Sequence, residues 1–279
     1  MNAPDPDTVD ARRTLLRGLF DDAGLFPPAS LPVPEAAAGH IRARGGPHAW
    51  ILGRFVCSAS KLSDLIEYAR GEPFRVSVIL DTADAAMRAG EAAVRSAGAI
   101  IIEQSEAKLP ATPPEDAIAG LLARAGEWPL FIEIPVAAIA VVTMLEGQTG
   151  IGVKIRCGGD VIPSAGSVAA TIAACRDAGV RFKATAGLHH PRRTDDRHGF
   201  LNLCAATVAA SQGASEDDIA AIVDERDPSA IALESSALTV RGRSYDPAAC
   251  AAAREMLLAS IGSCSFDEPV EDLIAMGIL

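Results

Sequence analysis

From residue 50 onward, short apolar segments alternate with segments of helix length, and this alternation restricts the fold more than any other feature of the chain. The apolar segments are rich in Ile, Val and Phe on both faces, which is typical of a parallel sheet covered by helices. Regular alternation of strands and helices indicates successive βαβ units. The predicted strands are residues 50–57, 74–81, 99–103, 129–134, 152–159, 181–191 and 230–238, with a brief eighth candidate at 262–266.

These units predict an α/β fold, a closed (β/α)8 TIM-like barrel. An open Rossmann sheet fits less well, because no Gly-x-Gly-x-x-Gly motif follows the first predicted strand. Since the eighth strand is very short, an incomplete barrel of seven strands is the alternative. The predicted helices are residues 9–20, 35–44, 61–70, 83–97, 114–125, 136–148, 164–178, 200–211, 216–225, 247–260 and 269–276.

The pattern divides the chain into an N-terminal helical extension, residues 1–48, and the barrel, residues 49–279. Within the extension, the segment 25–29 reads Leu-Phe-Pro-Pro-Ala. It is a stiff loop, because each proline fixes its own backbone and restricts the residue before it. Its apolar side chains would plug the bottom of the barrel, contact a second copy in a homo-oligomer, or cover a substrate.

Charge and composition argue against several classes of partner. The net charge is −11, whereas proteins that bind nucleic acids or anionic membranes do so through Lys and Arg. No apolar run approaches the roughly 20 residues that span a bilayer, and the acidic first ten residues do not resemble a signal peptide. The six cysteines are scattered without a Cys-x-x-Cys pair, which favours buried free thiols. We therefore expect a cytoplasmic protein whose partner is a small metabolite.

Three cations lie inside two neighbouring predicted strands, at positions where a core would have Val or Leu. They are Lys154 and Arg156 in Val-Lys-Ile-Arg, and Lys183 in Phe-Lys-Ala-Thr. Because alternate side chains of a strand face the same side, Lys154 shares a face with Arg156, and Lys183 shares one with Thr185. Ionised side chains are rarely buried without partners. We expect these residues to line an anion-binding pocket at the carboxyl ends of the strands, where the active sites of barrels lie.

These residues suit chemistry on a carbonyl group. A second cation lowers the pKa of a neighbouring lysine, and the neutral amine can then attack a carbonyl to form a Schiff base. We expect Lys183 to be the nucleophile, Lys154 to be the perturbing cation and Glu133 to move protons. Arg156 would bind a carboxylate or a phosphate. Without an imine, the same groups would stabilise an enolate. The predicted function is a lyase of the aldolase type that acts on a small anionic carbonyl compound.

Further candidates lie in other strands and in the histidine-rich loop 187–200. Arg54 lies inside the first predicted strand and is a candidate substrate-binding residue, as is Thr185. Ser235 and Ser263 lie near the last two predicted strands, where barrels often bind phosphate. The adjacent histidines of the loop, His189 and His190, would act as general acids or bases.

Two other functions stay open. Glu133, Glu103 and the histidine loop could hold a divalent metal, which would make the protein a metal-assisted isomerase or hydrolase. No other cofactor is predicted. Alternatively, the barrel binds an anionic metabolite without catalysis. In that case we expect Lys183 to pair with Glu133, with no cavity above it.

The two lysine-bearing segments, 153–156 and 182–187, resemble the paired-lysine strands of class I barrel aldolases, the deoxyribose-phosphate aldolase group in particular. The resemblance implies Schiff-base chemistry and a role for the lysine of each strand. The chain departs from the group at 156–159, where Arg-Cys-Gly-Gly stands in place of the usual Thr and Ser. Together with the segments 25–29 and 262–266, these strands also resemble an uncharacterised bacterial (β/α)-barrel family, which implies the fold and no activity.

Overall fold

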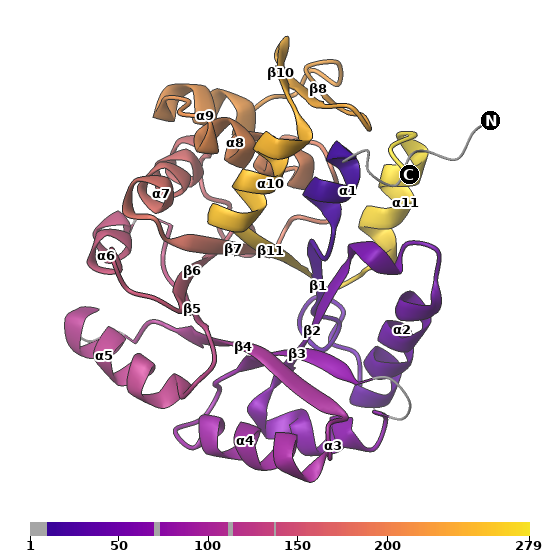
Figure 1. The fold of residues 1–279 in the computed structure, drawn as a ribbon, viewed down its shortest axis with the longest axis vertical. Coiled ribbons are helices and arrows are strands. Elements are labelled where there is room, and N and C mark those ends of the chain that lie inside the picture. The colour runs from indigo at the N-terminus through magenta and orange to yellow at the C-terminus, as the bar shows by residue number, and fades with distance from the viewer. Residues whose placement is uncertain (1–9, 70–72, 111–113, 137) are drawn as a thin grey trace.

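The computed structural model describes residues 10–69, 73–110, 114–136 and 138–279. Eight parallel strands close into a barrel in the order β1-β11-β7-β6-β5-β4-β3-β2 (Figure 1). The predicted (β/α)8 TIM-like fold is therefore confirmed, and the alternative of an incomplete seven-stranded barrel is wrong. The barrel strands are β1 (Phe20–Asp22), β2 (Leu52–Ser58), β3 (Phe74–Ile79), β4 (Ile100–Lys108), β5 (Leu130–Glu133), β6 (Ile151–Arg156), β7 (Arg181–Thr185) and β11 (Leu258–Ser263).

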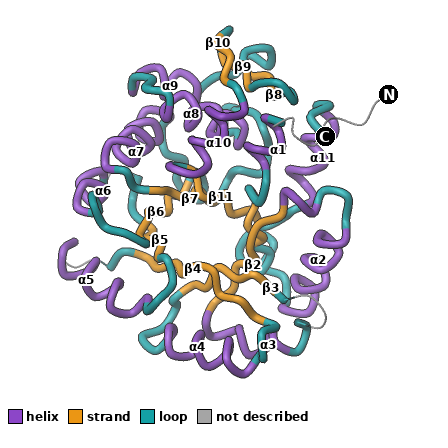
Figure 2. The backbone as a smooth tube through the Cα atoms, viewed as in Figure 1, coloured by secondary structure: helices purple, strands orange, loops and turns teal. Residues whose placement is uncertain are grey.

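Helices surround the barrel on its outside (Figure 2). Within the part of the chain that the structure describes, none of them is long and apolar enough to cross a membrane. The helices are α1 (Ala11–Leu16), α2 (Val33–Gly45), α3 (Leu62–Ile66), α4 (Ala85–Arg95), α5 (Pro114–Ala125), α6 (Ile139–Met144), α7 (Ala165–Ala178), α8 (Phe200–Ser211), α9 (Glu216–Val223), α10 (Pro247–Met256) and α11 (Asp267–Ala275).

The predicted seventh strand, residues 230–238, does not belong to the barrel. Its residues form β8 (Ile231–Leu233) and the start of β9 (Leu238–Val240), which pair antiparallel with each other and, through β9, with β10 (Arg243–Tyr245). This small sheet lies outside the barrel, near α8 and α9 (Figure 1). The apolar run is broken by a turn in which Glu234 N donates to Ala237 O, so the chain reverses instead of crossing the barrel.

Both ends of the chain supply barrel strands: β1 is not predicted from the sequence pattern, and β11 overlaps the brief candidate at 262–266 but begins four residues earlier. β1 lies within the predicted N-terminal extension, yet it pairs with β2 and with β11, so a boundary at residue 48 does not separate the extension from the barrel. The helix predicted over 9–20 stops at Leu16, and Gly18 adopts a left-handed backbone that starts the new direction. The helix predicted to reach residue 260 ends at Met256, because the apolar run that follows is β11.

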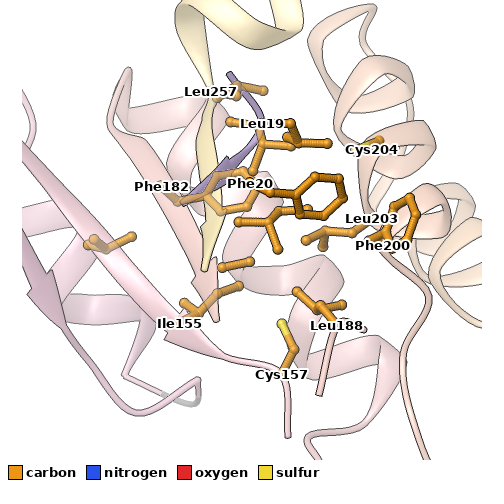
Figure 3. Packing of buried hydrophobic residues seen from close by; sticks show 14 of the residues in the cluster. Leu19, Phe20, Ile155, Cys157, Phe182, Leu188, Phe200, Leu203, Cys204 and Leu257 are labelled. Carbon is orange, nitrogen blue, oxygen red and sulfur yellow. The ribbon is translucent and has the colours of Figure 1, made fainter. Parts of the chain in front are cut away.

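Outward-facing side chains of the barrel pack against α8 (Figure 3). The ring centroids of Phe20, on β1, and Phe200, on α8, lie 5.0 Å apart in an edge-to-face arrangement, and Phe182, on β7, belongs to the same cluster. Because successive side chains of a strand face opposite sides, this packing turns Asp21 and Lys183 into the barrel. The apolar layer outside therefore fixes the position of charged residues inside.

Candidate active site

A layer of polar side chains crosses the interior of the barrel, and we call it the buried polar layer. Each of its members is less than a tenth exposed. Polar groups at such depth are stable only when they are hydrogen-bonded, and charges only when they are paired. The layer consists of Asp21 on β1, Ser77 on β3, Gln104 and Glu106 on β4, Lys154 on β6, Lys183 on β7 and Ser260 on β11.

Lys183 is enclosed by carboxylates and is 1% exposed. Its Nζ lies 2.6 Å from Asp21 Oδ2, 2.5 Å from Glu106 Oε1 and 3.4 Å from Ser77 Oγ. Asp21 Oδ2 also accepts a hydrogen bond of 2.7 Å from Ser260 Oγ. The ammonium group therefore has two charged partners that come from β1 and β4, strands distant from β7 in the sequence.

Lys154 lies opposite Lys183 in the register of β6 and β7. It also has two carboxylate partners, of which Glu106 is shared with Lys183. Its Nζ lies 2.9 Å from Glu106 Oε2 and 3.0 Å from Glu133 Oε2. Glu106 thus bridges the two lysines, with one oxygen for each ammonium group. Its side chain is fixed further by Ser77 Oγ, which donates at 2.6 Å.

The ion pairs decide the protonation states in this layer. Burial opposes ionisation of Asp21 and Glu106, but the neighbouring lysines outweigh it and hold the pKa of each carboxyl below its ordinary value. Burial likewise opposes the charged form of Lys154, yet Glu106 and Glu133 raise its pKa. The sequence predicts that Lys154 acts on Lys183 as the perturbing cation, but a carboxylate, Glu106, bridges the two amines.

A cavity of about 710 Å³ lies at the carboxyl ends of the strands, and Glu106, Lys154 and Lys183 form part of its wall. The loop residues Phe26, Pro27 and Pro28 also line it. The segment 25–29 therefore does not plug the bottom of the barrel, and it lies where a cover for a substrate would be. For a barrel without catalysis we expect Lys183 to pair with Glu133 under no cavity, whereas it pairs with Asp21 and Glu106 and a cavity lies above it.

Two cations on the cavity wall differ from the buried lysines in forming no ion pair with a described residue. Arg156, at the end of β6, and Lys108, at the end of β4, line the cavity, and neither makes an ion pair with a described residue. Thr185 lines the cavity as well. The structure thus brings the predicted substrate-binding residues Arg156 and Thr185 to the same space as Lys154 and Lys183.

The two adjacent histidines of the loop have different positions. His189 lines the cavity, and its Nδ1 lies 2.7 Å from Glu268 Oε2. His190 is not among the residues that line the cavity, and its Nδ1 lies 2.7 Å from Asp272 Oδ2. Of this predicted pair, the geometry brings only His189 to the lysines' cavity.

Three other predicted substrate-binding residues do not line the cavity. Arg54 lies 3.7 Å from Asp21 Oδ1, and its Nε lies 2.9 Å from Glu103 Oε2 without the alignment of a hydrogen bond. Ser235 lies in the turn between β8 and β9, outside the barrel. Ser263 is buried, and its Oγ donates to the backbone oxygen two residues later at 2.6 Å.

The residues predicted for a divalent metal are also dispersed. Glu103 pairs with Arg54 and Arg75, whereas Glu133 pairs with Lys154. Across residues 10–69, 73–110, 114–136 and 138–279, no three His, Cys, Asp or Glu side chains are grouped as metal ligands. The set of Glu133, Glu103 and the histidine loop therefore does not form one site in this structure.

The two carboxylates of the buried polar layer, Asp21 and Glu106, are missing from the predicted site, as are its uncharged members. Asp21 falls in the segment predicted as a loop, and Glu106 falls beyond the predicted end of its strand at residue 103. For Glu106 the sequence carries no strand signal, because Glu106, Ala107 and Lys108 are residue types that are depleted in strands. For Asp21 the strand has only three residues, too few to show a period.

Neither a scan against protein-family models nor a search of curated proteins found a match for this chain. The function is therefore argued from the geometry of the cavity and the buried polar layer.

Proposed function

We propose that the protein is a lyase of the aldolase type that acts on a small anionic carbonyl compound through a lysine Schiff base. One observation carries the proposal: two lysines that share a carboxylate form the wall of a cavity at the catalytic end of a (β/α)8 barrel. Two unpaired cations lie on the same wall and can hold an anionic group of the substrate.

The geometry favours Lys154 over Lys183 as the amine. Lys154 is 8% exposed, and one of its two carboxylate partners, Glu133, has a side chain that is 18% exposed. Lys183 is 1% exposed and is held by two carboxylates that are themselves buried. Movement of Lys154 toward a substrate therefore disturbs one buried and one partly solvated ion pair, whereas movement of Lys183 breaks two buried ones. Lys183 then serves to fix Glu106.

Proton transfer from Lys154 to Glu133, 3.0 Å away, gives the neutral amine that attacks the carbonyl carbon. Loss of water from the resulting carbinolamine leaves an iminium ion. The iminium carries the same positive charge as the ammonium it replaces, so Glu106 Oε2 stabilises both. Glu133, which has returned its proton to the departing water, takes the proton of the hydroxyl group β to the iminium, and that fragment leaves as an aldehyde. The electron pair of the broken carbon–carbon bond passes to the iminium, which becomes an enamine. Protonation of the enamine by Glu133 or His189, followed by hydrolysis of the imine, returns the lysine.

Arg156 has the chemistry to bind the anionic group of the substrate, because a guanidinium matches a carboxylate or a phosphate with two parallel hydrogen bonds. It lies two residues beyond Lys154 on the same face of β6. Lys108 adds a second positive charge to the wall. An anion held there would place the rest of the molecule over the buried lysines.

Borohydride trapping tests the proposal. The full-length protein is incubated separately with pyruvate, glyoxylate and glyceraldehyde 3-phosphate, reduced, and analysed by intact and peptide mass. We expect an adduct of the reduced imine on Lys154. The variant Lys154→Arg should lose the adduct, because it keeps the cation for Glu106 and Glu133 but removes the nucleophilic amine. Lys108→Arg, a change on the same cavity wall, should keep it.

Circular dichroism and thermal unfolding show whether each variant is folded. An adduct on Lys183 would reverse the assignment of the two lysines and leave the Schiff base in place. If the folded protein forms no adduct with any of the three compounds or with a small-molecule cell extract, the Schiff-base mechanism is wrong. In that case the same cavity supports an enolate mechanism or binding without turnover, since both lysines are ion-paired at rest.

A further inference from the structure

Cys264 differs from the other five cysteines of the chain in its surroundings. Those five are buried, whereas Cys264 is partly exposed and lines the cavity. Burial raises the pKa of four of the buried thiols to about 12 and that of the fifth to about 11, so they are inert thiols at neutral pH. The five are Cys57, Cys157, Cys175, Cys204 and Cys250.

Cys264 contacts His189, which in turn contacts Glu268. The three residue types are those of a nucleophile, a base and a group that orients the base. Cys264 Sγ lies 3.8 Å from His189 Nε2 and 4.0 Å from His189 Nδ1, and His189 Nδ1 lies 2.7 Å from Glu268 Oε2. The carboxylate accepts a hydrogen bond from Nδ1, and Nε2 is the position at which the imidazole takes and returns the proton of the thiol. Cys264 and His189 both line the cavity, and Glu268 approaches from the first turn of α11.

The charges around His189 favour its protonated form. The hydrogen bond with Cys264 contributes most, burial opposes it, and Glu268 adds to it, so that the pKa of His189 is raised to about 9. An imidazolium beside a cysteine stabilises the thiolate, which is the reactive form of the side chain. The same loop region also holds Asp196 and Arg197, which line a small second cavity together with His189.

We propose that Cys264, His189 and Glu268 form a second nucleophilic site on the cavity wall, where the Cys264 thiolate adds reversibly to a small aldehyde. The choice of an aldehyde rests on the proposed function, because the same cavity is assigned to a carbonyl compound. The presence of a nucleophilic thiolate rests on the three side chains alone.

The addition is balanced without any further reactant. His189 Nε2 takes the proton of the thiol, and a bond forms between Sγ and the carbonyl carbon. The π electrons of the carbonyl move to its oxygen, which receives the proton back from the imidazolium. The product is a hemithioacetal, and the reverse sequence releases the aldehyde and restores the thiol. No oxidant and no leaving group take part.

Alkylation by iodoacetamide at pH 7 tests the thiolate, with the five buried cysteines of the folded protein as internal controls. Peptide mass analysis should find Cys264 modified about tenfold faster than the thiol of glutathione, and the buried cysteines unmodified on that timescale. His189→Gln should slow the modification of Cys264 about tenfold, and Glu268→Gln should slow it by less. Equal rates for the wild type and His189→Gln would overturn the proposed site, provided that circular dichroism shows both to be folded.

Glyoxylate tests the addition itself. It should slow the alkylation of Cys264, and dilution of the aldehyde should restore the rate because the hemithioacetal is reversible. The protection should persist in Lys154→Arg, which cannot form an imine at residue 154. Protection that vanishes in this variant would mean that an imine merely blocks the cavity, and the hemithioacetal would be refuted. Rapid alkylation of Cys264 that glyoxylate does not slow would also refute the addition to an aldehyde, while the proposed thiolate would stand. The Schiff-base proposal can therefore fail without this one failing.

Discussion

Replacement of Lys183 by methionine should destabilise the fold strongly. Methionine keeps much of the length of the side chain and removes its charge. Asp21 and Glu106 would each lose a partner that lies 2.6 Å and 2.5 Å away, respectively, in a part of the barrel where all three side chains are buried. Asp21 keeps only Arg54 as a charged partner, at 3.7 Å, and Glu106 keeps Lys154.

The size of this loss of stability follows from two opposing free energies, the attraction between the charges and the cost of removing them from water. At an effective dielectric constant of about 20, two unit charges at these distances attract by about 6 kcal/mol. Removal from water costs several kcal/mol for each ion, so the intact cluster contributes little net stability. The variant loses the attraction but keeps both carboxylates buried, and loss of one partner of a buried ion pair costs about 3–5 kcal/mol. That is a large share of the roughly 5–15 kcal/mol by which a folded domain is stable.

Urea unfolding of the wild type and Lys183→Met at pH 8 and pH 5 measures this cost. The loss of stability should be smaller at pH 5, because protonation neutralises carboxylates that have lost their cation. Lys108→Met is the matched control, since Lys108 is an exposed lysine of the same cavity, and its cost should stay within about 0.5 kcal/mol. Equal costs for the two variants, or a cost for Lys183→Met that is the same at both pH values, would refute the reasoning.

Three further predictions follow from the same cluster and its neighbourhood. Folding lowers the pKa values of Asp21 and Glu106, so their contribution to stability is present above the unfolded pKa values of about 4 and is lost as the pH falls below them. Urea titrations at a series of pH values should therefore show a steep loss of wild-type stability below about pH 4. A flat profile in that range would contradict the ion pairs. A Cβ at Gly53 would collide with Asp21 Oδ1, so Gly53→Ala should lower the free energy of unfolding by about 1–3 kcal/mol. Gly90 lies in open space within α4, so Gly90→Ala should raise it by up to about 1 kcal/mol. Similar shifts of the melting temperature for both variants would speak against the clash. Arg156→Gln should weaken the binding of glyoxylate, measured by calorimetry, about tenfold or more and leave the stability unchanged within about 0.5 kcal/mol; unchanged affinity would remove Arg156 from the site.

The barrel and the inward positions of its lysines could be predicted because both depend on local patterns. The alternation of apolar segments predicts the βαβ units, and the cations inside apolar strands predict a polar interior at Lys154 and Lys183. These patterns survive in the structure because a residue's face on a regular strand depends only on its parity.

The partners of the lysines could not be predicted in the same way. The pairing of β3 and β4 shifts its register between Val76 and Ser77, which face Ile102 and Gln104, so Glu103 has no partner in the ladder. Such a bulge changes which side chains face inward and lets the strand continue to Glu106. The inward position of Asp21 depends on tertiary contacts, because its three-residue strand, β1, is held by pairing with β2 and β11.

The charge balance of the interior limits what the substrate can be. Asp21, Glu106 and Glu133 oppose only two ammonium groups, so the lysines have no positive charge left to attract an anion. An anionic group must therefore be held by the unpaired cations of the wall, Arg156 above all. Two residues along a strand correspond to about 6.6 Å between the Cα atoms of Lys154 and Arg156, whose side chains share one face. A substrate that reaches both has its anionic group a few bonds from its carbonyl carbon, and a larger molecule would have to extend past Phe26 and the prolines that follow it.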